Sequence, residues 1–247
     1  MSKTFSTKGI VLRTVKYGET SVIVSIFTEL FGIQSYLVNG VRASSKKGSG
    51  KANLFQPTAL LDLEVYHNEL KQLQRIKEFR WACLYHHLLS DVRKNAVALF
   101  MVELLAKCLK QPEANPDLFH FAEDAFVHLD ESPDTVTANF PLFFALHLPV
   151  FFGFRIHDSF SEKNVFLDLQ EGRFTNTMPP HPHFLDDQYA ETTARLLRAM
   201  QPRELTDIRL HRDFRRHLLH AYEKYYALHI QDFGILRTLP VLREILS

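Results

Sequence analysis

The densest group of chemically active side chains in this 247-residue chain is basic and lies in residues 42–51. This segment contains Arg42, Lys46, Lys47 and Lys51 among glycine and serine residues, and it contains no acidic residue. Glycine and serine predict a flexible arm, and uncompensated positive charge attracts phosphate groups. Two interpretations stay open, namely a solvated loop and a basic arm that closes over a nucleic-acid backbone.

The end of this segment is superficially similar to a phosphate-binding loop, because its last four residues are Gly-Ser-Gly-Lys. A true phosphate loop also needs a glycine further upstream and a helix that begins with serine or threonine after the lysine. Both features are missing here. The sequence therefore argues against nucleotide hydrolysis.

Histidine is abundant, with thirteen residues, and so metal binding has to be considered. His181 and His183 flank a proline in a segment without cysteine, and no carboxylate pair stands at ligand spacing. Asp186 and Asp187 would at best complete an unusual site. We therefore predict neither a bound metal nor another cofactor.

The usual catalytic arrangements are also missing from the sequence. His86 and His87 are adjacent, so on a helix they point to different sides and cannot bind one ion together. No Gly-x-Ser-x-Gly motif, no cysteine in a polar setting and no isolated carboxylate pair occurs. We predict a protein that is not an enzyme, and a metal-dependent hydrolase is the weakest of the alternatives.

The composition is that of an ordinary globular protein, with 46% hydrophobic residues. The most apolar run, residues 140–154, is interrupted by Pro141, His147, Pro149 and Gly153, whereas a membrane-spanning helix needs ~20 predominantly apolar residues. The N-terminal residues contain no apolar core of an export signal. These features predict a cytoplasmic protein without a membrane partner.

Charge is distributed unevenly along the chain. Residues 1–80 contain 12 Lys and Arg against 6 Asp and Glu, whereas residues 81–247 contain 17 against 22. A basic segment joined to a mildly acidic body is typical of a polyanion-binding module on a scaffold. The basic third of the chain is therefore the first place to expect a nucleic-acid site.

Period-two alternation of apolar residues predicts β-strands in the basic third. The turn dipeptide Asn39-Gly40 and the turn around Gly18 separate some of these strands. Five short strands in about eighty residues suit a small barrel, because a closed sheet has no exposed edges. The predicted strands are residues 9–15, 21–28, 33–38, 60–66 and 73–79.

From Trp81 onward the apolar period becomes that of helices. Cys83 and Cys108 fall in helix-like apolar segments, which predicts buried, reduced thiols. We expect an N-terminal β-barrel domain at residues 1–80 and an α-helical domain at residues 81–247. The predicted helices are residues 95–109, 117–132, 140–154, 186–200 and 210–230, with a short hairpin near residues 165–174.

Several sequence patterns of the barrel segment together resemble the RecO family. An apolar strand ends in arginine, a Tyr-Gly-Glu turn follows, a second strand ends in Phe-Thr, and a Gly-x-Arg precedes the basic loop. The similarity is strong over residues 5–80 and thinner but collinear through the helices, at residues 144–154 and 239–243. The matching patterns are residues 9–13, 17–19, 23–28, 31–32, 38–42 and 55–57.

This resemblance implies an α+β multidomain protein, with an N-terminal OB-fold β-barrel followed by an α-helical bundle domain. It implies binding of single- and double-stranded DNA, strand annealing, and loading of recombinase onto DNA coated with single-strand-binding protein. The implied partners are RecR and the acidic C-terminal tail of single-strand-binding protein, in the nucleoid of a bacterial cytoplasm. The alternative is a protein- or RNA-binding OB-fold scaffold without DNA activity.

One departure from the family concerns residues 156–182. Many RecO proteins carry a four-cysteine zinc module in the corresponding region, and this chain has no cysteine there. The predicted hairpin near residues 165–174 is therefore expected to form without zinc.

The barrel segment supplies the candidate DNA contacts, since basic side chains follow the backbone and aromatic rings stack on bases in such barrels. Arg75 and Lys77 are expected to share a strand face with Leu73 and Phe79, so one or both could instead lie at the barrel rim. The candidates are Arg13, Lys16, Tyr17, Arg42, Lys46, Lys47, Lys51, Arg75 and Lys77.

A second basic cluster lies beside an apolar stripe of the last long predicted helix. One interpretation is a solvated helix face. The other is a docking site for an acidic peptide, whose carboxylates would pair with arginine. The residues of this cluster are Arg209, Arg212, Arg215 and Arg216.

Overall fold

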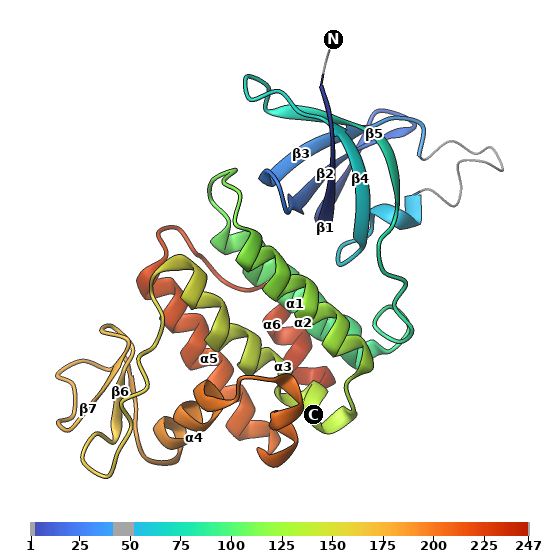
Figure 1. Ribbon diagram of the computed structural model, residues 1–247. Helices are drawn as coiled ribbons and strands as arrows, with labels where there is room; N and C mark the ends of the chain where they lie inside the picture. Colours follow the sequence, from blue (N-terminus) through green and yellow to red (C-terminus); the bar gives the residue numbers. More distant parts are fainter. Residues whose placement is uncertain (1–2, 42–51, 247) are drawn as a thin grey trace. The chain divides into compact units, whose positions relative to one another are not determined.

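The computed structural model describes residues 3–41 and 52–246, which form two compact units (Figure 1). The first unit combines Met1–Tyr85 with Leu109–Phe126, and the second combines His86–Cys108 with Val127–Ser247. The first unit is therefore not one continuous stretch of sequence. Each unit has its own apolar core and is described separately below.

The first unit contains a closed barrel of five strands in the order β1-β2-β3-β5-β4. Only the pairing of β3 with β5 is parallel. A short 3-10 helix, η1 (Ala52–Phe55), precedes β4. This OB-like barrel confirms the predicted architecture and the position of all five strands. The strands are β1 (Thr4–Tyr17), β2 (Ser21–Thr28), β3 (Gly32–Val38), β4 (Leu60–Tyr66) and β5 (Leu73–Trp81).

The barrel interior is filled by alternate residues of neighbouring strands, as the period-two pattern predicts. Val24, Ile26 and Tyr36 are fully buried there. Gly9 lies where β1 passes closest to the core: a Cβ at this position would come within 2.5 Å of the Cγ2 of Ile26. A side chain at residue 9 would therefore displace the barrel core.

A β-bulge in β5 changes which residues share a face. Val65 of β4 pairs with Ile76 and Glu64 pairs with Glu78, so Lys77 has no partner in the register. The extra residue turns Phe79 toward the interior, where its ring lies 4.7 Å from that of Phe55. The prediction that Phe79 shares a face with Arg75 and Lys77 was therefore wrong.

Part of α2 (Pro116–Glu131) belongs to the first unit and packs against the barrel. The ring of Phe119 lies 5.6 Å from that of Phe27, and Lys8 forms a 2.7 Å ion pair with Glu123. The backbone of Glu113, just before this helix, passes so close to Gly32 that a Cβ there would lie 2.2 Å from the Glu113 carbonyl oxygen. Residues 109–126 thus cover one side of the barrel.

The second unit is a helical bundle around α3 (Asp134–His147), which contacts helices on several sides. Figure 1 shows this arrangement in green to red. The prediction of a central buried helix is confirmed, although the helix starts at Asp134 and tightens to a 3-10 turn, η2 (Leu148–Phe152). The other elements of the bundle are α1 (Val92–Cys108), α4 (Asp187–Arg198), η3 (Pro202–Asp207), α5 (Arg212–His229) and α6 (Thr238–Ile245).

By length and composition alone, Asp134–Phe152 is apolar enough to cross a membrane. Within the second unit, 67% of its most apolar window is buried. Helix α3 packs against α1, α4 and α5, which accounts for its apolar character as that of a core helix.

The first predicted helix, residues 95–109, is present, but the helical period assigned to the preceding segment is not realised. Strand β5 continues to Trp81, residues 82–91 are irregular, and the first helix begins only at Val92. Asp91 starts α1 by accepting the backbone N–H groups of Arg93 and Lys94 at 2.8 and 3.0 Å. Consequently Cys83 is half-buried in an irregular segment rather than in a helix, whereas Cys108 is buried as predicted.

The predicted hairpin is confirmed as β6 (Phe166–Asp168) and β7 (Arg173–Thr175). A third short strand, β8 (Phe184–Leu185), pairs with the other side of β6 and was not predicted. Its Phe184 ring packs edge-on at 6.0 Å from Phe166. The result is a small three-stranded sheet, with order β7-β6-β8.

Candidate nucleic-acid interface

The strand register brings the side chains that point outward from four strands into two cross-strand rows. Arg13 of β1 is opposite Ser25, which is opposite Ser35, and Ser35 pairs with Leu73. These residues form the first row. The second row lies two residues further along β1 and consists of Val15, Ile23, Leu37 and Arg75. We call this surface the β1–β3–β5 face; its residues are Arg13, Val15, Tyr17, Ser21, Ile23, Ser25, Ser35, Leu37, Leu73 and Arg75.

The β1–β3–β5 face is positively charged, because β2 and β3 contain no Asp, Glu, Lys or Arg and β1 contains only basic ones. The acidic residue of β5, Glu78, lines the cavity on the other side of the barrel. The side chains of Arg13 and Arg75 are exposed at opposite edges of the face. Tyr17 is 53% exposed and lies beside them, across from Ser21. Three of the predicted DNA contacts are thus brought together on one surface.

Lys16 lies at the end of the barrel rather than on this face. It pairs with Val22, which pairs with Val38, and these valines point into the barrel. Lys16 itself is exposed, because the pairing of Lys16, Val22 and Val38 lies at the rim of the barrel. Strand β3 also ends at Val38, so the chain leaves β3 at the same end of the barrel as Lys16 and Tyr17.

The four basic residues of the loop, Arg42, Lys46, Lys47 and Lys51, lie outside the described residues. The described chain ends on one side of them at Val41, which is 1% exposed, and resumes at η1, where Phe55 is also 1% exposed. Both anchor points are therefore buried in the barrel core.

The opposite side of the barrel, around β4, is rich in carboxylates. A cavity of about 490 Å³ opens there, lined by Glu29, Asp62, Glu64 and Glu78 among other residues. Arg80 pairs with Asp62 at 3.1 Å. The lining also contains the basic Lys8 and Arg80, so four carboxylates face two basic side chains and the net charge of the cavity is negative. This side of the barrel is therefore less suited to a polyanion than the β1–β3–β5 face.

Lys77, a predicted DNA contact, forms a 2.7 Å ion pair with Glu64 on this carboxylate-rich side. The ion pair raises the pKa of Lys77, through a side-chain hydrogen bond and the charge of Glu64. The bulge in β5 separates Lys77 from Arg75, which pairs with Leu37 on the β1–β3–β5 face. Arg75 and Lys77 are thus not brought together.

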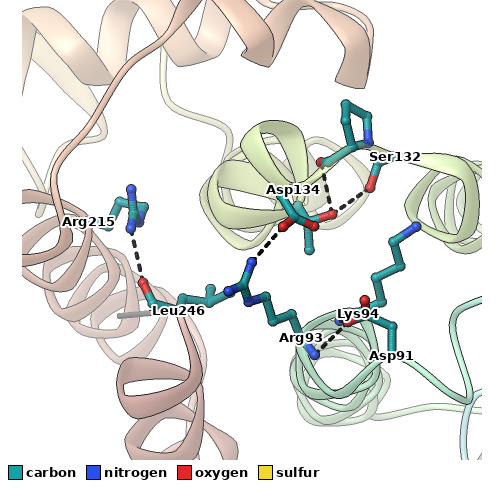
Figure 2. A network of polar contacts seen from close by, with 9 residues as sticks. Asp91, Arg93, Lys94, Ser132, Asp134, Arg215 and Leu246 are labelled. Atoms are coloured by element: carbon teal, nitrogen blue, oxygen red, sulfur yellow. Dashed lines mark hydrogen bonds and ion pairs between the residues drawn. The ribbon is translucent and has the colours of Figure 1, made fainter.

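The predicted arginine cluster at the start of α5 also divides, into three exposed side chains and one that is partly buried. Arg212 and Arg216 of α5 both approach the carboxylate of Asp213, at 3.7 and 3.4 Å, and Arg209 is exposed just before the helix. Arg215 points inward and donates hydrogen bonds to the carbonyl oxygens of Leu210 and Leu246, the latter at 3.0 Å (Figure 2). Burial lowers the pKa of Arg215.

The apolar stripe beside these arginines is part of the core, since Phe214 is 9% exposed and Leu218 and Tyr222 are almost fully buried. It cannot form an exposed notch. Arg212 and Arg216 instead line a cavity of about 490 Å³ with three residues of α6. Those residues are Pro240, Arg243 and Glu244. Sequence reasoning missed Arg243, because α6 itself was not predicted.

Among the described residues, no group of three or more His, Cys, Asp and Glu side chains is arranged to hold a metal ion. The Nε2 atom of His181 lies 3.3 Å from the Asp168 carboxylate, and its Nδ1 accepts the backbone N–H of His183 at 3.3 Å. Asp168 also accepts the backbone N–H groups of Gln170 and Glu171. His181 and Asp168 are therefore used in bonds that hold the small sheet together.

Comparison with known proteins agrees with the barrel and bundle. Residues 1–85 match the family model described as "Recombination protein O N terminal", and residues 89–161 match "Recombination protein O C terminal". The chain is 33% identical over 241 residues to the DNA repair protein RecO of Phocaeicola vulgatus, covering 98% of each chain. It is 32% identical over 241 residues to that of Flavobacterium psychrophilum, again covering 98% of each.

Proposed function

Because this chain belongs to the RecO family and has a role in DNA repair and recombination, we propose that its barrel binds single-stranded DNA along the β1–β3–β5 face. The observation that carries this proposal is the asymmetry of the barrel. Arg13 and Arg75 lie on a face to which β1, β2 and β3 contribute no carboxylate, whereas the side around β4 gathers four, including Glu78 of β5, beside the basic Lys8 and Arg80. A polyanion is attracted to the first surface and repelled by the second.

The chemistry of the face suits a single strand. Arg13 and Arg75 would contact phosphates, and the ring of Tyr17 offers a stacking surface for a base. The apolar row of Val15, Ile23 and Leu37 between them would contact base or sugar edges. The basic residues of the 42–51 segment would add phosphate contacts.

The wider role that we propose is that of a recombination mediator without enzymatic activity. It would bind double-stranded DNA as well, anneal complementary strands, and help load recombinase together with RecR in the bacterial nucleoid. The acidic tail of single-strand-binding protein would dock on the helical unit near Arg209, Arg212 and Arg216. Arginine suits this task because its planar guanidinium pairs carboxylates bidentately.

One observation favours a second candidate, a scaffold that binds RNA or another protein. The row of Val15, Ile23 and Leu37 is apolar and partly exposed, which also suits a protein partner. Competition between labelled single-stranded DNA and unlabelled RNA of the same sequence separates these functions. Equal competition would favour the scaffold.

Titration of fluorescent single-stranded DNA at several salt concentrations tests the proposed interface. We expect the Arg13→Ala and Arg75→Ala substitutions each to weaken binding and to reduce the slope of log affinity against log salt by about 0.7. Arg80→Ala is the matched control, because Arg80 is exposed on the carboxylate-rich side. If Arg80→Ala weakened binding as much as the other two, the DNA would not follow the β1–β3–β5 face.

A further inference from the structure

The loop that joins β4 to β5, residues 67–72, presents an apolar side chain to solvent. Its Leu70 is 95% exposed, so this side chain contributes almost nothing to the barrel core. Figure 1 shows this β4–β5 loop, in teal, projecting from the barrel. Turn positions are usually filled by Gly, Asn, Asp or Ser. The stability of the fold therefore does not explain a leucine at this position.

The β4–β5 loop is held in one conformation by hydrogen bonds. The Asn68 carbonyl oxygen accepts the backbone N–H of Lys71 at 3.0 Å, which closes a tight turn, and the Asn68 side chain accepts the N–H of Leu70 at 2.9 Å. Gln74 is 3% exposed and fills the loop from inside. Its Oε1 accepts the N–H of Asn68 at 3.0 Å, and its Nε2 donates to the carbonyl oxygens of Asn68 and Lys71. Leu70 is thus displayed on a preorganised loop, which loses little entropy when a ligand binds.

The β4–β5 loop leads directly into the β1–β3–β5 face. Strand β5 begins at Leu73, which is 39% exposed and ends the first row of the face beside Ser35. Arg75 follows two residues later and ends the second row. Leu70 therefore precedes an exposed leucine of the face by three residues, at the edge that a DNA strand crossing from β1 to β5 would reach.

The composition of the β4–β5 loop indicates which part of DNA it suits. Glu69 and Lys71 are its only Asp, Glu, Lys or Arg residues, so their charges cancel and the loop would contact DNA through apolar surface. Leucine is one of the side chains that nucleic-acid-binding proteins insert between base steps as wedges. A single leucine between two charged residues is a small surface for a stable protein interface, which buries about 800 Å² on each partner. The narrow apolar tip fits the space between two bases better.

We propose that the β4–β5 loop inserts Leu70 as a wedge between two neighbouring bases of the bound single strand, and that Gln74 is a positioning residue that holds the loop and contacts no base. The inference rests on the proposed function, because the loop meets a strand that lies on the β1–β3–β5 face. The wedge adds an activity to binding. It opens the base stack of the bound strand, which leaves the hydrogen-bonding edges of its bases free to pair.

The test uses the full chain and single-stranded DNA that contains 2-aminopurine, an adenine analogue whose fluorescence rises when it is unstacked. At saturating protein, the unsubstituted chain should raise this fluorescence, and Leu70→Ala should abolish most of the rise. Leu70→Met keeps an apolar side chain of similar volume and should retain the rise. Because Leu70→Ala removes no charge, it should weaken DNA binding about fivefold and leave the salt slope unchanged.

The matched control is Leu30→Ala, because Leu30 is 45% exposed in the turn between β2 and β3, next to Glu29 of the carboxylate-rich side. It should retain the fluorescence rise, and an equal loss in both variants would overturn the wedge. If the unsubstituted protein does not bind single-stranded DNA, the proposed function and this inference both fail. If it binds DNA without the rise, or if Leu70→Ala retains the rise, the DNA proposal stands and the wedge is overturned.

Gln74→Ala tests the positioning role, because it removes the three side-chain hydrogen bonds of Gln74 and leaves Leu70 in place. The fluorescence rise at saturating protein should fall, while the salt slope stays unchanged. Circular dichroism would establish that the variant is folded, and a folded variant with the full rise would overturn the positioning role. If Gln74→Ala does not fold, Asn68→Ala tests the same loop from an exposed residue by removing the bond to the Leu70 N–H, with the same expected and contradicting results.

Discussion

At the scale of single residues, Asp130 of the second unit connects two distant segments of the chain through hydrogen bonds to the backbone. Its carboxylate accepts three backbone N–H groups, from His86, His87 and Leu88, at 2.8, 2.7 and 2.6 Å. Burial by itself would raise the pKa of Asp130, but these three donors and the charge of Lys94 outweigh burial, and the pKa is lowered. Asp130 therefore holds the irregular segment that precedes α1.

We predict that Asp130→Asn lowers the free energy of unfolding by about 1–3 kcal/mol, because one amide N–H₂ would face backbone donors and leave them unsatisfied. Urea unfolding monitored by circular dichroism measures this change. The control is Asp134→Asn, since Asp134 forms only an exposed ion pair with Arg93 (Figure 2). That substitution should change stability by less than about 0.5 kcal/mol.

The lowered pKa of Asp130 also sets a pH dependence. A carboxyl group whose pKa is lower in the folded state stabilises the fold above its ordinary pKa of 3.8, and this stabilisation is lost as the pH falls below that value. The unsubstituted protein should therefore lose stability more steeply than Asp130→Asn below about pH 4. Parallel stability curves for the two proteins at these pH values would contradict this role.

Part of the geometry of the candidate interface could be predicted from the sequence. Arg13, Tyr17 and Arg75 share a face because strict alternation along regular strands places them there. Lys77 was placed on the same strand face as Arg75 incorrectly, because a bulge in β5 lies between them. This bulge depends on how β5 pairs with β4, and the sequence of β5 alone does not reveal it. Arg215 could not be separated from Arg212 and Arg216 because one of its two acceptors, Leu246, lies 31 residues away.

At the scale of elements, the strands were predictable because each buries one face. The helical period inferred from Trp81 onward does not correspond to a helix before Val92, because residues 86–88 bond to Asp130, more than forty positions away. Helix α6 was missed because it has only eight residues, with a proline in its first turn, and because Glu103 of α1 bonds to its first residues. Such long-range contacts cannot be predicted from the spacing of apolar residues within a segment.

The small sheet of β6, β7 and β8 gives a prediction about metal. We expect well under one equivalent of zinc in protein purified without chelator, and an unchanged thermal midpoint when chelator is added. The physical reason is that His181 and Asp168 are already bonded to each other and to the backbone. A stoichiometric metal, or a fall in the thermal midpoint with chelator, would contradict this account.

At the scale of the whole molecule, positive charge is concentrated in the first third of the chain, and the proposed DNA contacts include its 42–51 segment. We predict that changing Lys46, Lys47 and Lys51 to alanine weakens DNA binding about equally for all sequences. Each lost phosphate contact should reduce the salt slope on single strands by about 0.7. Fluorescence titration at several salt concentrations measures both effects.

A folded triple variant with an unchanged salt slope would remove these lysines from the interface. The matched control substitutes Lys8 and Arg80, which lie on the carboxylate-rich side of the barrel. It should leave the slope unchanged if the charge of the 42–51 segment, and not total charge, determines binding.

The first compact unit is interrupted in sequence by residues 86–108, and this has a consequence for protein synthesis. Lys8 and Glu123, which join β1 to α2, are 115 positions apart. On a ribosome that adds 5–20 residues per second, roughly 2–8 s pass between the synthesis of Trp81 and that of Glu123. During most of this interval all five strands have been synthesised but Phe119 has not, so the ring of Phe27 can be covered only by later translation.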